Sequence, residues 1–363
     1  MKTKGKKIDR LYGIELLRII SMLMVLSLHF LIKGNYNKSE NVYVNSESWV
    51  LICFSVVAVN CYVLISGYFM CEKSFKLSRI INTYTQMFFY SIATFAVMII
   101  IGINQFSVGS LAKSIMPFVF NNYWFVTTYI LLLFISPLLN SAINNMSKSK
   151  MKLVLFTLVC IFCFINNIVK PINPIESSGG YGLIWFIVLY MTAAYIKKYY
   201  VASGEWIKYF LLYVVFAVIN FGVHCLFSGK GVVWDNSMVR DYNNILVYCA
   251  SVCLFLAFLN LRINNKVMIR IIGFISPLTF AVYLIHESPF VQSFIWEHIN
   301  VNKLCLDNGM FFLFAIVTII LLFLLCCCFE FIRSRLFKVL RINKGIIRIS
   351  DFAERIIRKK VGK

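Results

Sequence analysis

Three ionisable side chains lie within the first long apolar segment of the chain, at residues 11–32. They are Glu15, Arg18 and His29. At about 100° per residue, the eleven steps from Arg18 to His29 return to within roughly 20° of the same direction, about 16 Å further along a helix. Glu15 falls about 40° from His29, on the same stripe. An imidazole can accept a proton near neutral pH, and a guanidinium can bind an anion.

The position of this stripe inside an apolar segment needs an explanation. A charged side chain at the centre of a bilayer costs roughly 2.5–3.5 kcal/mol even on the mildest scale, so we expect the stripe to face a cavity or other helices. A simpler interpretation is an i,i+3 pair between Glu15 and Arg18 near the inner surface, with His29 at the outer interface. The segment alone leaves both interpretations open.

A second polar point lies in the apolar segment 271–296, where His286 is followed by Glu287. This segment is expected to run outward, which places His286 at a depth similar to that of His29. Pro289 cannot donate the backbone hydrogen bond of a regular helix, so we expect a kink there. A kink beside a His-Glu pair suggests a functional site, although a histidine packed against a neighbouring hydroxyl is an equally good interpretation.

Two further groups of side chains lie at the ends of apolar segments. Trp124 and Tyr129 open the fourth segment at its outer end, where aromatic residues commonly mark the membrane interface; the alternative is a platform on which a sugar stacks. Lys76 and Arg79 follow the second segment on the inner side. They satisfy the general excess of positive charge inside, or they bind a phosphorylated ligand from the cytoplasm.

The composition indicates what kind of protein positions these residues. Apolar residues make up 60% of the 363 and charged residues 14%, against about 45–50% and 25% in soluble domains. Soluble and disordered classes are therefore excluded, and we expect an all-α integral membrane protein. About ten segments are long enough to be membrane-spanning helices: 11–32, 49–70, 84–103, 123–143, 151–169, 181–196, 206–227, 243–260, 271–296 and 310–332.

The distribution of positive charge predicts the orientation. Most of the 36 Lys and Arg residues fall before the first span, in alternate loops and after the last span, which places both termini in the cytoplasm. The net charge of +21 is then explained by topology and anionic lipid rather than by nucleic acid. We expect a ten-span membrane domain at 1–332 and a basic amphipathic cytoplasmic tail at 333–363. Most of the 12 cysteines lie in apolar segments, and no metal site is expected.

At these residues the chain resembles the acyltransferase 3 family, membrane-bound O-acyltransferases that modify bacterial surface polysaccharides. The family's Arg-x10-His pattern in the first helix, preceded by an acidic residue, is similar to Arg18-x10-His29 with Glu15, although many members carry Asp there. Three more motifs match in order between about residues 10 and 330: Ser66-Gly67 with Lys76 and Arg79, Trp124-Phe125 with Tyr129 and Pro137, and Tyr283-Leu-Ile-His286.

The resemblance implies a stand-alone, multi-pass O-acyltransferase of the cytoplasmic membrane, most often an O-acetyltransferase, with no permanently bound cofactor. Its donor would be acetyl-CoA or another acyl-CoA, and its acceptor a hydroxyl of a cell-surface or lipid-linked glycan. His29 is the expected general base, Arg18 would position the donor or stabilise developing charge, and Glu15 would hold Arg18. The expected donor-binding residues are Lys76, Arg79 and Arg18, and the expected acceptor-binding residues are His286, Trp124, Tyr129 and Glu287.

Two other classes of function remain open at this stage. A transporter or flippase of a lipid-linked glycan would also be polytopic, but transporters commonly show paired repeats and broken helices. The chain shows no convincing repeat and carries few helix-breaking residues, with 17 Gly and 6 Pro. A non-catalytic assembly partner is possible too, but would leave the polar stripe unexplained. The sequence leaves the acceptor sugar, the exact acyl group and the oligomeric state open.

Overall fold

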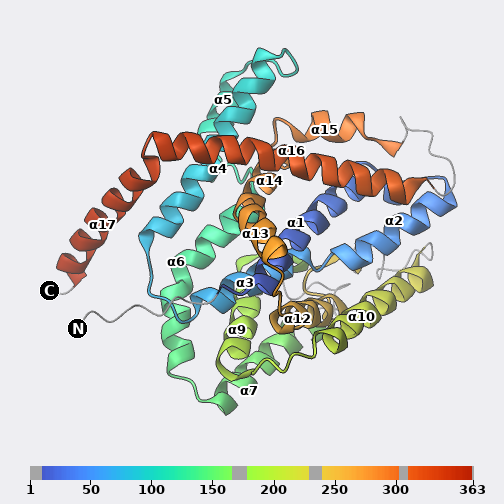
Figure 1. Ribbon diagram of the computed structural model, residues 1–363, viewed down its shortest axis with the longest axis vertical. Helices are drawn as coiled ribbons and strands as arrows, with labels where there is room; N and C mark the ends of the chain where they lie inside the picture. Colours follow the sequence, from blue (N-terminus) through green and yellow to red (C-terminus); the bar gives the residue numbers. More distant parts are fainter. Residues whose placement is uncertain (1–9, 166–177, 229–238, 302–309, 362–363) are drawn as a thin grey trace.

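The computed structural model describes residues 10–165, 178–228, 239–301 and 310–361, and within them all regular secondary structure is helical (Figure 1). In the described ranges, seven helical segments are long and apolar enough to cross a membrane. The chain is therefore a multi-pass membrane protein. These segments are α1 (Tyr12–Lys33), α2 with α3 (Val42–Ser55 and Ala58–Met70), α4 (Leu77–Ile100), α6 (Trp124–Asn144), α10 (Trp206–Phe227), α13 with α14 (Lys266–Ile275 and Thr279–His286) and α16 (Phe311–Val339).

Three of the ten segments expected from the sequence correspond to shorter helices. These are α7 (Lys148–Val159), α9 (Leu183–Tyr199) and α12 (Ile245–Asn260). A π-helical turn, Cys160–Ile165, extends α7, and the last residues of the expected span 151–169 lie outside the described residues. Two short helices, α5 (Val108–Ile115) and α15 (Gln292–His298), complete the bundle together with the C-terminal α17 (Ile342–Val361).

Local capping explains where several of the helices begin. The Asn41 side chain accepts hydrogen bonds from the first backbone amides of α2, and Asn265 does the same for α13. Ser147 and Asn244 cap α7 and α12 in the same way. Such caps satisfy amides that have no partner inside the helix, and each contributes about 1 kcal/mol.

The helix α1 occupies the centre of the bundle. In its most apolar window 67% of the residues are buried, compared with 28% in α16 and 22% in α10. It packs against α2, α3, α12, α13, α14 and α16, whereas α10 and α16 present much of their surface outward. The polar stripe of α1 therefore faces other helices, which is the first of the two interpretations that the sequence left open.

The expected span 271–296 is wrong at its C-terminal end. The helix does not continue through Pro289 with a kink; α14 ends at His286, and α15 starts separately at Gln292. The amide of Ser288 bonds the carbonyl of Ile285, so that carbonyl is satisfied by a tight turn. Glu287 is the C-cap of α14: its amide still bonds the carbonyl of Tyr283, and its side chain faces α1.

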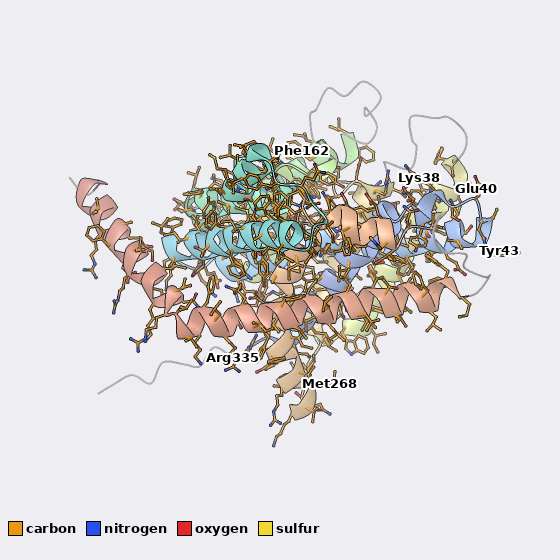
Figure 2. All side chains as sticks on the ribbon, turned by 90° about the horizontal axis from the view of Figure 1, so that it is seen from above. Lys38, Glu40, Tyr43, Phe162, Met268 and Arg335 are labelled. Atoms are coloured by element: carbon orange, nitrogen blue, oxygen red, sulfur yellow. The ribbon has the colours of Figure 1, made fainter. Side chains whose placement is uncertain are left out.

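The C-terminal tail forms a helix of its own, as expected, but starts later than the boundary at 332/333. The helix α16 continues to Val339, and Arg341, with φ of 55°, turns the chain into α17. The tail helix lies against α4, where Glu354 accepts a hydrogen bond from the amide of Leu77 (2.7 Å). In the view of Figure 2, Lys38, Glu40 and Tyr43 lie at the opposite end of the bundle from α17.

Candidate active site

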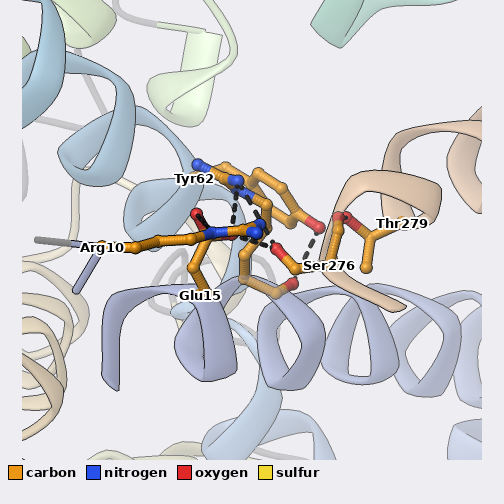
Figure 3. Close-up of polar contacts among 6 residues, drawn as sticks. Arg10, Glu15, Tyr62, Ser276 and Thr279 are labelled. Atoms are coloured by element: carbon orange, nitrogen blue, oxygen red, sulfur yellow. Dashed lines mark hydrogen bonds and ion pairs between the residues drawn. The ribbon is translucent and has the colours of Figure 1, made fainter. Parts of the chain in front are cut away.

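Glu15 is the centre of a hydrogen-bonded cluster at the start of α1 (Figure 3). It accepts from Arg10 Nε (3.1 Å) and from Arg18 Nη1 (2.9 Å), and the hydroxyl of Ser276 donates to it as well. Ser276 lies where α13 gives way to a 3₁₀ turn with a proline at its start. An acidic group in the first turn also suits the positive end of the helix dipole. This cluster fixes the Arg18 guanidinium between α1 and the α13–α14 junction.

His29 and His286 are in direct contact across the interface of α1 and α14. The Nδ1 atom of His29 lies 2.8 Å from Nε2 of His286, and Nδ1 of His286 bonds the carbonyl oxygen of Val282. Because a carbonyl only accepts, Nδ1 of His286 carries hydrogen and its Nε2 accepts. His29 then donates from Nδ1, which leaves its Nε2 with a free lone pair. The network thus assigns the tautomer a general base requires.

Glu287 completes this group as a third member. Its carboxylate lies 3.3 Å from Nδ1 of His29 and forms an ion pair with Lys33. Lys33 also donates to Gln292 (2.8 Å) at the start of α15. A carboxylate beside Nδ1 stabilises an imidazolium once the ring has taken a proton, as in catalytic triads. The arrangement can therefore accept a proton at Nε2 of His29 and stabilise the resulting charge.

Three adjoining cavities follow the polar stripe of α1. We name them the Arg18 cavity, the central cavity and the Lys33 cavity, with volumes of about 260, 30 and 330 Å³. Tyr62, Phe125 and Phe280 form the wall shared by the first two; His29, Trp124, Leu28 and Tyr242 form the wall shared by the last two. Arg18 and His29 therefore line neighbouring cavities that share parts of their walls.

The structure separates the two aromatic residues that were expected to bind acceptor together. Trp124 lies at the central and Lys33 cavities, where it stacks on Tyr242 (centroids 6.0 Å apart) and packs against Tyr181 (4.6 Å). Tyr129 lies one and a half turns further along α6 and lines the Arg18 cavity. Trp124 and His29 thus share a cavity, while Tyr129 lies on the side of Arg18.

The two basic residues expected to bind donor phosphates lie at the start of α4. Lys76 precedes the helix and is exposed, and Arg79 is half-buried in its first turn. The carbonyl of Arg79 accepts from Thr83 (2.9 Å), and Thr83 lines the Arg18 cavity. Arg79 is therefore one helical turn from this cavity, although neither basic side chain is among the residues that line it.

Several residues of the site were not singled out by the sequence. Ser276 and Tyr62 fix Arg18, the latter by donating to its backbone carbonyl (2.9 Å). Lys33 fixes Glu287 but looked like an ordinary loop charge. One signal was available: Lys33 lies four residues after His29, on the same helical face. The contact between Ser276 and Glu15 joins residues 261 positions apart. No local sequence pattern could have predicted it.

The histidine group also contains the ligand types of a zinc site. One atom each of His29, His286 and Glu287 lies within 4.8 Å of the others. In the structure His29 contacts both His286 and Glu287, and Glu287 is also paired with Lys33. The positive charge of Lys33 would repel a metal ion at the same carboxylate. We interpret the group as a device for proton transfer, and the expectation that no metal is needed stays a prediction.

Comparison with known families agrees with this geometry. The family model described as an acyltransferase domain, that of acyltransferase 3, matches residues 11–331. The chain belongs to the acyltransferase 3 family. No curated protein and no solved structure matches it. The matched range ends within α16, so this acyltransferase has all three cavities inside its family domain.

Membership in the family makes the protein a transferase that moves acyl groups. Such a reaction needs a base for the attacking hydroxyl, a site for the acyl donor and a stabilised tetrahedral intermediate. The Nε2 atom of His29 is available to accept a proton in the tautomer described above, and the Arg18 guanidinium lines a cavity of its own. Both side chains are partly buried between the apolar helices of the bundle.

Proposed function

We propose that this acyltransferase moves an acetyl group from cytoplasmic acetyl-CoA to a hydroxyl of a cell-surface or lipid-linked glycan. The observation that carries the proposal is the series of cavities that joins Arg18 to the His29–His286 pair. We expect the charged donor and the hydroxylated acceptor to enter it through different cavities. The proposal includes ten membrane crossings with both termini in the cytoplasm, in the cytoplasmic membrane.

The donor is proposed to enter at the Arg18 cavity. Arg79 and Lys76, at the start of α4, would meet its phosphates, and Arg18 would hold the pantetheine arm further in. Arg18 and His29 are about 16 Å apart along α1, so Arg18 does not reach a thioester that reacts beside His29. Of the two roles expected for Arg18, we therefore retain donor positioning, with Glu15 holding the guanidinium.

The acceptor is proposed to enter at the Lys33 cavity. Trp124, Tyr181 and Tyr242 give it aromatic faces, and Asp241 and Arg240 add charged groups to its wall. Aromatic surfaces that adjoin hydrogen-bonding side chains suit a sugar ring, which has both apolar faces and hydroxyls. Tyr129, on the donor side, is then expected to contact the donor rather than the acceptor.

Chemistry is proposed to occur in the central cavity. Nε2 of His29 removes the proton of the acceptor hydroxyl as the oxygen attacks the thioester carbonyl carbon. The C–S bond then breaks, the acyl group leaves on the acceptor oxygen, and the sulfur leaves as the coenzyme A thiolate, which takes up the proton. His286 and Glu287 hold Nδ1–H of His29 and stabilise the imidazolium between the two steps.

The test uses purified protein in lipid nanodiscs with ¹⁴C-acetyl-CoA and surface glycan treated with base to remove existing esters. Label should pass to the glycan with release of free thiol, and His29→Ala should lower this rate by about 10²–10⁴-fold. His298→Ala is the matched control, because that histidine is exposed on α15 and bonds only a neighbouring carbonyl. Transfer at the wild-type rate in His29→Ala would reject the base assignment.

A cellular comparison tests the substrate class. NMR spectra of surface polysaccharide from cells with and without the gene should differ by one acetyl ester signal. If all ester signals persist without the gene, the proposed acceptor class is wrong, whatever the purified protein does with other hydroxyl compounds.

A further inference from the structure

The proposed reaction needs a group that stabilises the negative oxygen of its tetrahedral intermediate. Such groups are commonly the largest single contribution to acyl transfer, and they must lie about 3 Å from the developing oxyanion. Arg18 is about 16 Å from His29 along α1, and Lys33 is engaged by Glu287 and Gln292. A different donor beside His29 is therefore required.

Tyr283 has a buried hydroxyl that the fold does not use. The residue is 5% exposed, and its hydroxyl has no hydrogen-bond partner among the described residues. Leaving such a group unpaired costs about 1–3 kcal/mol, so it is rarely kept without a use. The neighbouring Tyr62, by contrast, donates to the carbonyl of Arg18. Tyr283 lines the central cavity together with His29, and its buried hydroxyl lies beside the backbone of Phe125, another residue of the cavity wall.

A helix begins at the same cavity. The 21-residue α6 starts at Trp124, no side chain caps its first turn, and both Trp124 and Phe125 line the cavity. The ring of Tyr283 packs edge-on against Phe125, with centroids 5.8 Å apart. The first amides of a helix lack internal partners and carry its positive dipole end, which favours a negative charge nearby. The Tyr283 hydroxyl and the first backbone amides of α6 are thus hydrogen-bond donors close to one another at the wall of the central cavity.

We propose that the Tyr283 hydroxyl, supported by the N-terminus of α6, forms the oxyanion site of the acyltransferase. This inference rests on the proposed function. When the acceptor oxygen attacks the carbonyl carbon, the carbonyl π electrons move to its oxygen, which accepts a hydrogen bond from Tyr283. When the C–S bond breaks, the electrons return to re-form the carbonyl. Tyr283 keeps its own proton throughout, and the proton of the acceptor goes to His29.

The position of Tyr283 on α14 supports the assignment. It lies three residues before His286, so both side chains project from the same face of one short helix. Their rings pack edge-on, with ring centroids 6.1 Å apart. The base and the oxyanion donor are thus held at a fixed spacing: His286 fixes His29, and Tyr283 is rigid on the same turn. A single helix would set both parts of the reaction centre.

The test compares two Tyr→Phe variants that remove the same atom. Tyr283→Phe should lower kcat for acetyl transfer by about 10²–10³-fold, the usual effect of losing one oxyanion donor, and leave KM for acetyl-CoA unchanged. Tyr123→Phe is the matched control: its hydroxyl is also buried and has no hydrogen-bond partner in the described part of the chain, but Tyr123 does not line the central cavity. We expect Tyr123→Phe to transfer at the wild-type rate.

Thermal unfolding distinguishes a catalytic role from a structural one. Removing a hydroxyl without a partner is neutral or slightly stabilising, so Tyr283→Phe should unfold at or above the wild-type temperature. A lower unfolding temperature would show a structural partner and overturn the assignment, as would an unchanged kcat or an equal loss in Tyr123→Phe. If the wild-type protein itself transfers no acetyl group, the proposed function fails and not merely this inference.

Discussion

The contact between His29 and His286 predicts a specific pattern of mutational effects. If His29 is the base, His29→Ala should slow acyl transfer by about 10²–10⁴-fold, or roughly 2.7–5.4 kcal/mol of activation free energy. His286→Ala removes only the acceptor that holds the Nδ1 hydrogen of His29. A hydrogen bond between neutral groups contributes about 0.5–1.5 kcal/mol, and Glu287 remains 3.3 Å away as a second acceptor. The loss should therefore be roughly 2–10-fold.

The double variant makes this prediction decisive. Because His286 acts only through His29, the double variant should be no slower than His29→Ala alone, as expected for residues that work as one unit. The assay is single-turnover release of thiol from acetyl-CoA with base-treated glycan, with His298→Ala as the control. If His286→Ala were slower than His29→Ala, the roles would be reversed. If the two effects multiplied, the histidines would act independently and the assigned tautomers would be wrong.

Four further outcomes are expected. Glu15→Gln, which loses the charge that holds its arginine partner, should weaken coenzyme A binding about 10-fold in calorimetry; unchanged affinity would contradict the donor site. Trp124→Ala should raise KM for glycan several-fold without changing KM for acetyl-CoA, whereas Trp206→Ala, outside the cavities, should change neither. Cysteines at Lys38 and Lys344 should react with an impermeant maleimide from opposite sides of the membrane. Dialysis against a strong chelator should leave the rate unchanged, and recovery with Zn²⁺ would instead identify a metal site.

The helical periodicity of the first segment predicted which of its side chains lie on one face. The spacing of Glu15, Arg18 and His29 placed them on one face of α1, and all three have polar partners inside the bundle. Helix rise also placed His29 and His286 at similar depth. Depth cannot say which helices are neighbours, however, so the 2.8 Å contact between them was not predictable from either segment.

Other parts of the site could not be predicted because they depend on contacts distant in sequence or on a choice between two local structures. Ser276 reaches Glu15 across 261 positions. Pro289 was compatible with a kinked helix or with a helix end, and the short α15 after it shows that the chain ends α14 and turns. That choice decides where Gln292 and the rest of α15 lie, and no local pattern distinguishes the two.

Tyr62, Phe125 and Phe280 stand between the Arg18 cavity and the central cavity. An enzyme open toward both faces of a bilayer risks conducting ions and dissipating the membrane voltage. Hydrated ions would meet a partition of aromatic carbon, which offers little to replace their water. A slender acylated arm can thread between such rings and then seal the gap it occupies. If the donor takes the proposed path, the same three side chains would keep the membrane electrically insulating while the enzyme turns over.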